Sequence, residues 1–267
     1  MPQLTPVTDP EDPRVAPYLA VRERDVAGRR GGFIAEGEVV LRVLARSPLV
    51  RARSLLIAQG RLTRLAPLIG QFPEETPVFS ASQAVMDAIV GFHIHRGVLA
   101  FGERIAEPSA ETLLAGLGPR ARVLALFGVS NHDNVGGIFR NAAAFGADAV
   151  LLDGACCDPL YRKAIRVSVG AALTMPFARL APEDDPIALF ARHDLTALAL
   201  SPAGETPLAR LVPPHRAVVV LGAEGAGLPD AILSRTHTIA IPMSGAFDSL
   251  NVATTSGIVL HHLAFAG

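Results

Sequence analysis

The stretch that decides the fold is Ile241-Pro242-Met243-Ser244-Gly245-Ala246-Phe247-Asp248-Ser249-Leu250-Asn251-Val252. We interpret it as a strand end, a tight loop and the first turn of a terminal helix. Pro242 and Gly245 turn the backbone away from the strand. Ser249 or Asp248 is expected to cap an apolar helix that runs to about Ala264. A helix N-terminus carries unpaired N–H groups and a partial positive charge, which suits a bound ligand. An ordinary capped helix is the alternative.

A second polar loop follows the first strand of the C-terminal half. It reads Gly128-Val129-Ser130-Asn131-His132-Asp133-Asn134-Val135-Gly136-Gly137-Ile138-Phe139-Arg140-Asn141. It lacks the G-x-G-x-x-G turn of dinucleotide-binding folds and the P-loop lysine, which argues against a dehydrogenase or an NTPase. Asn134 stands at a predicted helix start, and Arg140 lies inside an otherwise apolar helix. Arg140 therefore needs either a salt-bridge partner or a polar cleft.

A third loop follows a late buried strand and reads Leu221-Gly222-Ala223-Glu224-Gly225-Ala226-Gly227-Leu228. Parallel sheets bind ligands at the carboxyl ends of their strands, and glycines there let the backbone approach a ligand closely. Glu224 is placed to orient a polar group. Many α/β loops look alike, so this loop is informative only beside the other two.

Composition limits the classes of protein that fit. Half of the 267 residues are hydrophobic, enough for one large or two modest domains. The chain shows no run of about 18 uncharged apolar residues, and its acidic, proline-rich N-terminus is unlike a signal peptide, so we expect a cytoplasmic protein. The adjacent Cys156 and Cys157 suit a reducing compartment. With a net charge of −1, any nucleic-acid surface must be local.

The C-terminal half alternates strands and helices. Short apolar runs predict strands at 123–129, 149–152, 195–200, 217–221 and 237–241. Helical patterns lie between them at 135–145, 160–169 and 186–193. This alternation predicts an α/β domain over 122–267 with a mainly parallel sheet covered by helices on both faces.

The N-terminal half predicts a smaller α/β domain. We expect an extended arm over 1–16, the small domain over 17–104 and a linker over 105–121 that includes at most one short helix. The small domain has expected helices at 39–44 and 83–89, and expected strands at 54–58, 77–79 and 91–101. His93 and His95 would share one face of that last strand, a spacing that suits a metal, but without a third ligand a polar or RNA-facing surface is preferred.

One segment of the small domain is rich in arginine. It carries Arg42, Arg46, Arg51, Arg53, Arg61 and Arg64 and no acidic residue. These side chains are candidates for binding RNA phosphates. The alternative is ordinary surface charge in a chain that uses arginine for almost all of its cations.

Together, in residue type, spacing and order, the three loops resemble the three motifs of the SpoU (TrmH-like) RNA methyltransferases of the SPOUT superfamily. The resemblance covers about 122–264, and the small domain is similar to the RNA-binding domain that precedes it in many members. It implies an S-adenosylmethionine-dependent enzyme that methylates a ribose 2′-hydroxyl of rRNA or tRNA. It also implies a trefoil knot and a homodimer through the C-terminal domain. No metal is expected.

The resemblance also implies roles for individual residues. Backbone groups of the segments 221–227, 241–245 and 249–252 would bind the cofactor at Leu221, Gly222, Ala223, Glu224, Gly225, Ile241, Met243, Ser249, Leu250 and Asn251. The implied catalytic residues are Arg140, Asn134, Glu224, Ser249 and Asn251. Because a guanidinium stays protonated in proteins, we expect Arg140 to orient the hydroxyl and stabilise the developing alkoxide rather than act as a base. Asn134 would hold Arg140 or the ribose, and Ser249 would cap the helix while touching Arg140 or substrate.

Two positions depart from the family pattern. Ala253 stands where relatives commonly have serine, and His132-Asp133-Asn134 lacks the proline that often precedes the asparagine. Two alternatives stay open. One is an RNA-binding protein that kept the knot and lost the chemistry, and the other is a base methyltransferase, for which Asp248 would be a candidate proton acceptor.

Overall fold

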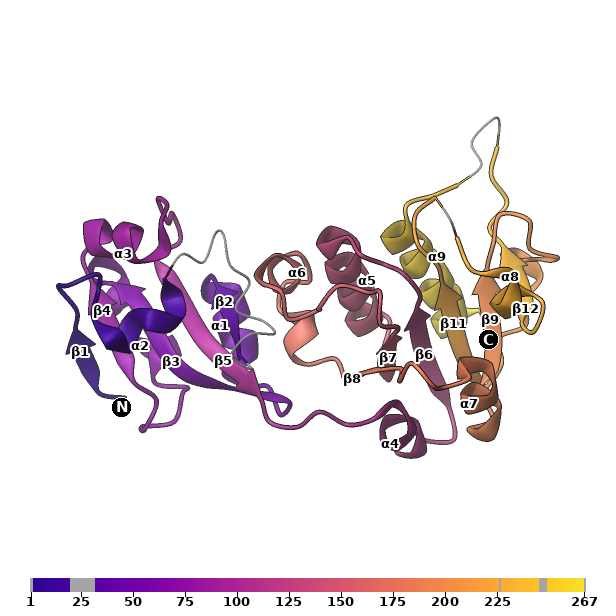
Figure 1. The fold of residues 1–267 in the computed structure, drawn as a ribbon, viewed down its shortest axis with the longest axis horizontal. Helices are drawn as coiled ribbons and strands as arrows, with labels where there is room; N and C mark the ends of the chain where they lie inside the picture. Colours follow the sequence, from indigo (N-terminus) through magenta and orange to yellow (C-terminus); the bar gives the residue numbers. More distant parts are fainter. Residues whose placement is uncertain (1, 20–31, 226, 245–248, 267) are drawn as a thin grey trace. The chain divides into compact units, whose positions relative to one another are not determined.

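The computed structural model describes residues 2–19, 32–225, 227–244 and 249–266 (Figure 1). Contacts divide the chain into two compact units. Unit 1 comprises Met1–Ala106 and Asp158–Thr174, and unit 2 comprises Glu107–Cys157 and Met175–Gly267. The segment 158–174 therefore groups with unit 1, although the sequence pattern assigned it to the domain over 122–267.

Unit 1 is built on a mixed five-stranded sheet. Its order is β1 (Leu4–Pro6), β4 (Val78–Ala81), β3 (Val50–Ala58), β5 (Val98–Arg104) and β2 (Gly32–Glu36). The pairs β1–β4 and β4–β3 are parallel, whereas β3–β5 and β5–β2 are antiparallel. The helices are α1 (Glu38–Leu44), α2 (Leu62–Ile69) and α3 (Gln83–Val90), with a 3-10 turn η2 (Gln59–Arg61) before α2.

The predicted extended arm at 1–16 is wrong. β1 extends the sheet as an edge strand, where Pro6 is tolerated because an edge strand leaves N–H positions unpaired. A 3-10 helix, η1 (Pro13–Tyr18), follows and buries Val15 and Tyr18. The Tyr18 hydroxyl bonds Ser54 Oγ at 2.7 Å and accepts from the Phe101 amide at 3.1 Å. The N-terminal residues are thus part of the core of unit 1.

Unit 2 contains a seven-stranded parallel sheet, which confirms the predicted fold class. Its order is β10 (Thr206–Pro207), β12 (His237–Ala240), β9 (Thr196–Leu200), β11 (Arg216–Leu221), β6 (Ala121–Leu126), β7 (Ala149–Leu152) and β8 (Phe177–Arg179). Every neighbouring pair is parallel. Parallel strands place all their carboxyl ends at one edge, where the loops after β9, β11 and β12 come together.

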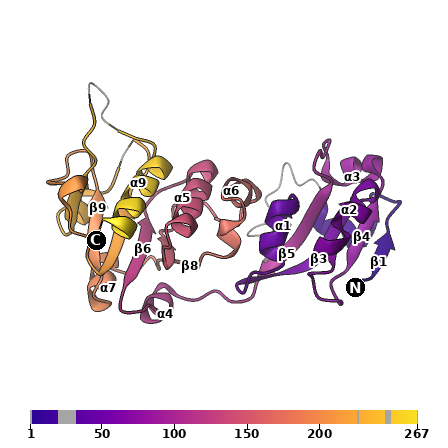
Figure 2. The same cartoon turned by 180° about the vertical axis from the view of Figure 1, so that it is seen from behind.

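Helices cover both faces of this sheet. Side chains of β6 and β11 alternate between the faces. Val123 and Val218 pack with α4 (Ala110–Ala115), α7 (Pro186–Arg192) and α8 (Asp230–Leu233) in one apolar cluster. The opposite face carries α5 (His132–Ala144) and α9 (Val252–Phe265), which lie side by side (Figures 1 and 2). A short 3-10 turn, η4 (Leu208–Arg210), precedes β11.

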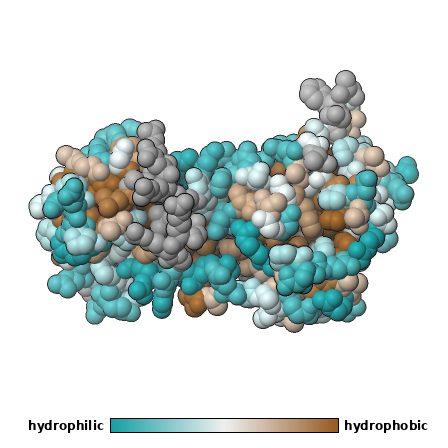
Figure 3. Space-filling model, viewed as in Figure 1, coloured by the Kyte–Doolittle hydropathy of each residue, from teal (hydrophilic) through white to brown (hydrophobic). Residues whose placement is uncertain are grey.

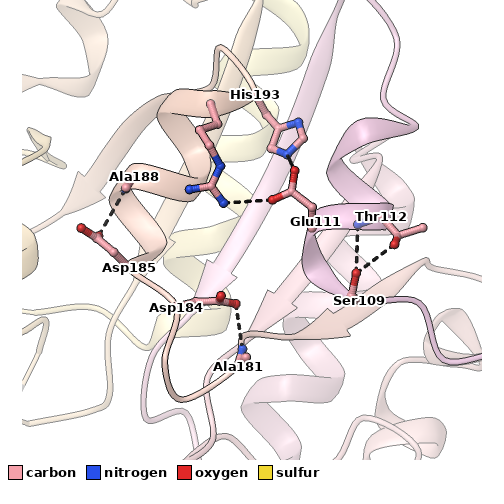
Figure 4. A network of polar contacts seen from close by, with 9 residues as sticks. Ser109, Glu111, Thr112, Ala181, Asp184, Asp185, Ala188 and His193 are labelled. Carbon is pink, nitrogen blue, oxygen red and sulfur yellow. Dashed lines mark hydrogen bonds and ion pairs between the residues drawn. The ribbon is translucent and has the colours of Figure 1, made fainter.

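Helix α4 lies inside the predicted linker and belongs to unit 2. Ser109 caps it by accepting from the Thr112 amide at 3.1 Å. Glu111 accepts from His193 at 2.8 Å, as Figure 4 shows, and from Arg192 at 2.9 Å. The Arg192 guanidinium, with His193, holds the pKa of Glu111 below its ordinary value. These contacts join α4 to the C-terminal end of α7 on the same face of the sheet.

Residues 158–174 come from the second half of the chain but belong to unit 1. They contain α6 (Arg162–Val167) and the 3-10 turn η3 (Ala171–Leu173). Arg162 donates to Glu36 at 2.9 Å, and Glu36 is only 8% exposed at the end of β2. The Ser47 hydroxyl donates to the Leu173 carbonyl. The side-chain contacts therefore attach this segment to β2 and to the loop after α1.

The surface is mixed in polarity. On the face drawn in Figure 3, hydrophilic residues surround several hydrophobic patches. On α9, Val259 and Leu260 are fully buried, whereas Ile258 and Phe265 are exposed. No helix in the described ranges is long and apolar enough to cross a membrane.

Candidate active site

A cavity of about 740 Å³ opens at the carboxyl edge of the parallel sheet in unit 2. Its walls are the ends of β9, β11 and β12 and the start of α9. All ten residues predicted to bind a cofactor line it: Leu221, Gly222, Ala223, Glu224, Gly225, Ile241, Met243, Ser249, Leu250 and Asn251. Two loops separated along the chain thus build one pocket, as the strand-end rule for parallel sheets requires.

The loop after β11 is folded tightly enough to require glycine. The Gly227 amide donates to the Ala223 carbonyl at 3.0 Å, and Gly225 and Gly227 have φ of 84° and 68°. A Cβ on Gly222 would lie 2.4 Å from the Gly227 carbonyl carbon and 2.6 Å from the Leu228 nitrogen. Both neighbours are backbone, so a side chain at 222 would displace the turn. The glycines therefore set the shape of this wall.

Asn251 joins the three predicted motifs. Its side-chain amide donates to Asn134 Oδ1 at 2.8 Å and to Glu224 Oε1 at 3.0 Å. Asn134 is buried at 5% exposure, and Glu224 and Asn251 line the cavity. One amide has two N–H donors, and both are used here. One bond reaches 117 residues back along the chain to Asn134, and the other reaches 27 residues back to Glu224. We call these three side chains the Asn–Asn–Glu junction.

Asn251 is also the N-cap of α9. Its Oδ1 accepts from the amides of Ala253 at 3.0 Å and Thr254 at 3.2 Å. The prediction that Ser249 caps this helix is therefore wrong, because the chain enters the helix two residues later. Ser249 instead lines the cavity. Asp248 and Gly245 lie outside the described residues.

Helix α5 is held against α9 by Asn141. The Asn141 amide donates to the Ala253 carbonyl at 2.6 Å and to Ser256 Oγ at 3.0 Å. A Cβ on Gly137 would lie 2.8 Å from Ala253 Cβ, so the two helices meet through small residues. Ala253, which stands where relatives commonly have serine, therefore lies at a tight contact between the two helices. Its side chain is not part of the Asn–Asn–Glu junction.

Arg140 projects from the exposed side of α5. It is one residue before Asn141 and six after Asn134, so its backbone is fixed by the same helix contact. Within the described part of the chain, Arg140 makes no hydrogen bond or ion pair. Neither the salt bridge to a structural partner nor the expected contact with Asn134 or Ser249 is formed.

The loop before α5 is anchored to the loop after β7. Asp153 accepts from the Gly128 amide at 3.0 Å, and Cys156 Sγ donates to the Leu126 carbonyl at 3.3 Å. Burial, more than the nearby Asp153, raises the pKa of Cys156 to about 12. The thiol is therefore protonated at neutral pH and serves a structural purpose rather than a nucleophilic one.

The sequence interpretation missed part of the cavity wall. Ser201 and Pro202 follow β9, and Thr255 projects from the first turn of α9. The loop after β9 has no glycine-rich signature. Its position after a predicted parallel strand was the available signal, because such strand ends converge on one site.

Four of the six predicted RNA-binding arginines of unit 1 are shared between two carboxylates. Arg42 and Arg64 both bond Glu38, at 2.7 and 3.1 Å. Arg51 and Arg53 both face Glu103, at 2.5 and 3.7 Å. Arg61 donates to the His95 carbonyl at 3.2 Å, and Arg46 is exposed. The acids that the segment lacks in sequence are therefore supplied by flanking elements.

The predicted strand at 91–101 begins only at Val98, so His93 and His95 lie in the loop before it. His93 Nδ1 bonds Asp87 at 2.7 Å, and the two imidazoles meet edge to face at 4.6 Å. Among the described residues no group of three or more potential ligands is placed to hold a metal ion.

Known proteins are similar to this chain in sequence and in fold. The model of the SpoU rRNA Methylase family matches residues 121–261. An uncharacterized tRNA/rRNA methyltransferase of Mycobacterium bovis is 37% identical, over 98% of this chain and 92% of its own. A solved RNA 2′-O ribose methyltransferase is 25% identical and aligns with a TM-score of 0.77 over 97% of this chain and 98% of its own.

A solved rRNA methyltransferase of Sinorhizobium meliloti with bound AdoMet shares the fold at a TM-score of 0.78, with 24% identity and 97% of each chain covered. The family model spans more than half of this chain, and the mycobacterial relative covers nearly all of it. The chain therefore belongs to the SpoU rRNA methylase family.

Proposed function

We propose that this protein is an S-adenosylmethionine-dependent RNA methyltransferase that acts on a ribose 2′-hydroxyl. The observation that carries the proposal is the Asn–Asn–Glu junction at the mouth of the 740 Å³ cavity, which brings all three family motifs to one place. Family membership and the likeness to a 2′-O ribose methyltransferase structure support the same reaction.

The cavity fits the proposed cofactor. Its volume lies within the range of about 300–1,000 Å³ typical of small-molecule sites. Apolar side chains such as Leu221, Ile241 and Leu250 offer contact for an adenine, and the glycine-bearing loop offers backbone donors and acceptors. Among the described lining residues, Glu224 is the one carboxylate, and it is suited to a ribose hydroxyl or a cationic group. When bound, S-adenosylmethionine supplies an electrophilic methyl group.

The chain's own residues would do two things in the reaction. Arg140 would bind the RNA beside the reacting ribose, orient the 2′-hydroxyl and stabilise its developing negative charge. The Asn–Asn–Glu junction would hold the start of α9 and the loop after β11 against α5, the helix that carries Arg140. Ser249 would contact substrate from the same rim.

Assembly and threading follow the family resemblance. We propose a homodimer through unit 2, supported by the exposed apolar side chains of Leu250, Ile258 and Phe265, which are 42, 38 and 67% exposed. We also propose that the chain is knotted at the cavity and that the cytoplasm is its compartment.

Labelled methyl transfer tests the function. Total RNA from cells lacking the gene is incubated with the protein and methyl-labelled S-adenosylmethionine, digested to nucleosides and analysed by mass spectrometry. Label in one 2′-O-methylnucleoside is expected, and 2′-O-methyl mapping locates the position. Label in a base would favour a base methyltransferase, and absence of transfer would favour an RNA-binding protein without catalysis.

Gly222→Ala is expected to weaken S-adenosylmethionine binding by about tenfold or more, roughly 1.4 kcal/mol, because the new methyl group would overlap the backbone at 227 and 228. Isothermal titration calorimetry measures the affinity. Gly154→Ala is the matched control, since a Cβ there meets nothing within 4 Å and should leave binding unchanged. Parental affinity in Gly222→Ala would show that the turn does not shape the cofactor site.

Replacing Arg51 and Arg53 together is expected to weaken RNA binding and to lower the slope of log K against log salt by about 1 to 2, as for losing one or two phosphate contacts. Both side chains are more than half exposed and share a single carboxylate. Glu103→Gln is the converse control, because it releases both arginines and should strengthen binding. Fluorescence anisotropy measures the RNA affinity over a series of salt concentrations. An unchanged slope would show that neither arginine contacts an RNA phosphate.

A further inference from the structure

Unit 1 contains a pocket of its own, of about 490 Å³. We call it the unit 1 pocket. It is formed by the start of α1, by η2 and α2, and by the loop that leads into β5. None of these elements belongs to the cavity described above, and two residues of the pocket, Val39 and Arg96, were in no predicted site.

The rim of the pocket is cationic. Arg61, Arg64 and Arg96 line it, against one carboxylate, Glu38. Glu38 is already shared by Arg64 and Arg42. Arg96 makes no hydrogen bond or ion pair with any residue that the structure describes. The pocket therefore carries an excess of positive charge that a phosphate would neutralise.

Two glycines create the space for these arginines. Gly37 has φ of 96°, and a Cβ on it would lie 2.8 Å from an Arg96 guanidinium nitrogen. Gly97 has φ of 59°, and a Cβ there would lie 3.0 Å from Ala58 Cβ and 3.5 Å from Arg61 Cγ. Arg61 is further fixed by its bond to the His95 carbonyl. The guanidinium groups are therefore positioned by backbone close to the pocket.

The floor is apolar. Leu65 and Val98 are buried at 3 and 2% exposure, whereas Val39 lines the pocket with 57% of its surface exposed. An inorganic anion would gain nothing from such a floor. A duplex presents phosphates but keeps its bases stacked inside. An unpaired nucleotide offers both a flat base for Val39 and Leu65 and phosphates for the arginines.

We propose that the unit 1 pocket binds one unpaired nucleotide of the RNA substrate. The base would lie on Val39 and Leu65, and the flanking phosphates would be held by Arg61, Arg64 and Arg96. The inference rests on the proposed RNA methyltransferase function, and it adds that unit 1 selects RNA by an extruded nucleotide rather than by charge alone.

Direct binding tests it. The full-length protein is titrated with fluorescein-labelled single-stranded RNA 12-mers and with a blunt RNA duplex of the same length. We expect preference for the single strand, a fall of about threefold to tenfold on single strands for Arg96→Ala, and a similar fall for the uncharged change Val39→Ser. Arg166→Ala is the charge-matched control, on an exposed residue of α6 outside the pocket. Equal losses in Arg96→Ala and Arg166→Ala, or equal binding of single strand and duplex, would overturn the proposal.

Cross-linking keeps the test independent of variant folding. Single-stranded RNA with 4-thiouridine is irradiated with the wild-type protein, and adducts are mapped by mass spectrometry. Adducts on peptides that contain 38–39, 61–65 or 95–98 support the proposal, and adducts only elsewhere overturn it. Competition by millimolar free nucleoside monophosphate as strong as by RNA would also overturn it, in favour of a free-nucleotide site. Methyl transfer to total RNA is measured separately. If the wild-type protein methylates RNA but gives no adducts in the unit 1 pocket, this inference is wrong while the proposed function stands.

Discussion

Arg140→Ala is expected to lower kcat for methyl transfer by about a hundredfold to a thousandfold, the usual loss when one preorganised stabiliser of developing negative charge is removed. The structure leaves this guanidinium exposed on α5, and its removal breaks no hydrogen bond or ion pair with a described residue. We therefore expect the melting temperature to stay close to that of the parent. The measurement is single-turnover methyl transfer to RNA from cells lacking the gene.

Two further variants separate charge from geometry. Arg140→Lys keeps the charge but loses the planar pair of donors, so an intermediate rate is expected if the hydroxyl is oriented by two N–H groups. Arg210→Ala removes an exposed arginine of the same unit outside the cavity and should leave the rate unchanged. Near-parental methylation by Arg140→Ala, with normal cofactor and RNA affinity, would show that the assignment is wrong.

Much of unit 2 could be predicted because its strands are buried on both faces. The runs at 149–152 and 217–221 are uninterrupted apolar stretches that match β7 and β11 closely. β8 and β10 were missed because three and two residues give no readable period. In unit 1, α2 was missed although Leu65 and Leu68 mark its buried face, because Pro67 inside it suggests an interruption.

The sequence predicted most of the residues that line the candidate site, but not the hydrogen bonds that those residues make. Strand-end loops of a parallel sheet must meet, so the convergence of 221–225 with 241–251 follows from topology. Which side chain caps α9 depends on where the chain enters the helix, and Ser249, Asp248 and Asn251 are all good caps. The bond from Asn251 to Asn134 requires α5 and α9 to lie side by side, a contact that no local pattern encodes.

Asn251 should be the most informative residue of the junction because it has two separable jobs. As N-cap it satisfies two amides of α9, a contribution of about 0.5–2 kcal/mol. As donor it satisfies the buried Asn134, and an unsatisfied buried acceptor costs about 1–3 kcal/mol. Asn251→Ala removes both, so we expect a loss of roughly 2–4 kcal/mol of unfolding free energy and a lower melting temperature by calorimetry.

The variant Asn251→Asp separates the capping of α9 from the donation of hydrogen bonds to Asn134 and Glu224. The aspartate keeps the capping oxygen, and its charge is favourable at a helix N-terminus, so α9 should remain stable. It loses both donors and places a second carboxylate where the amide now lies 3.0 Å from Glu224, so the cavity rim should open by charge repulsion. We therefore expect Asn251→Asp to lose about tenfold to a hundredfold in S-adenosylmethionine affinity. Both variants leave Asn134 without its donor, so Asn251→Asp should lose less stability than Asn251→Ala by about the 0.5–2 kcal/mol of the retained cap. Ser109→Ala removes the cap of α4, far from the cavity along the chain and outside its lining, and should lower stability by about 1 kcal/mol with parental affinity. If Asn251→Asp bound the cofactor like the parent, the bridge to Asn134 and Glu224 would be a structural accident, and capping alone would explain the residue.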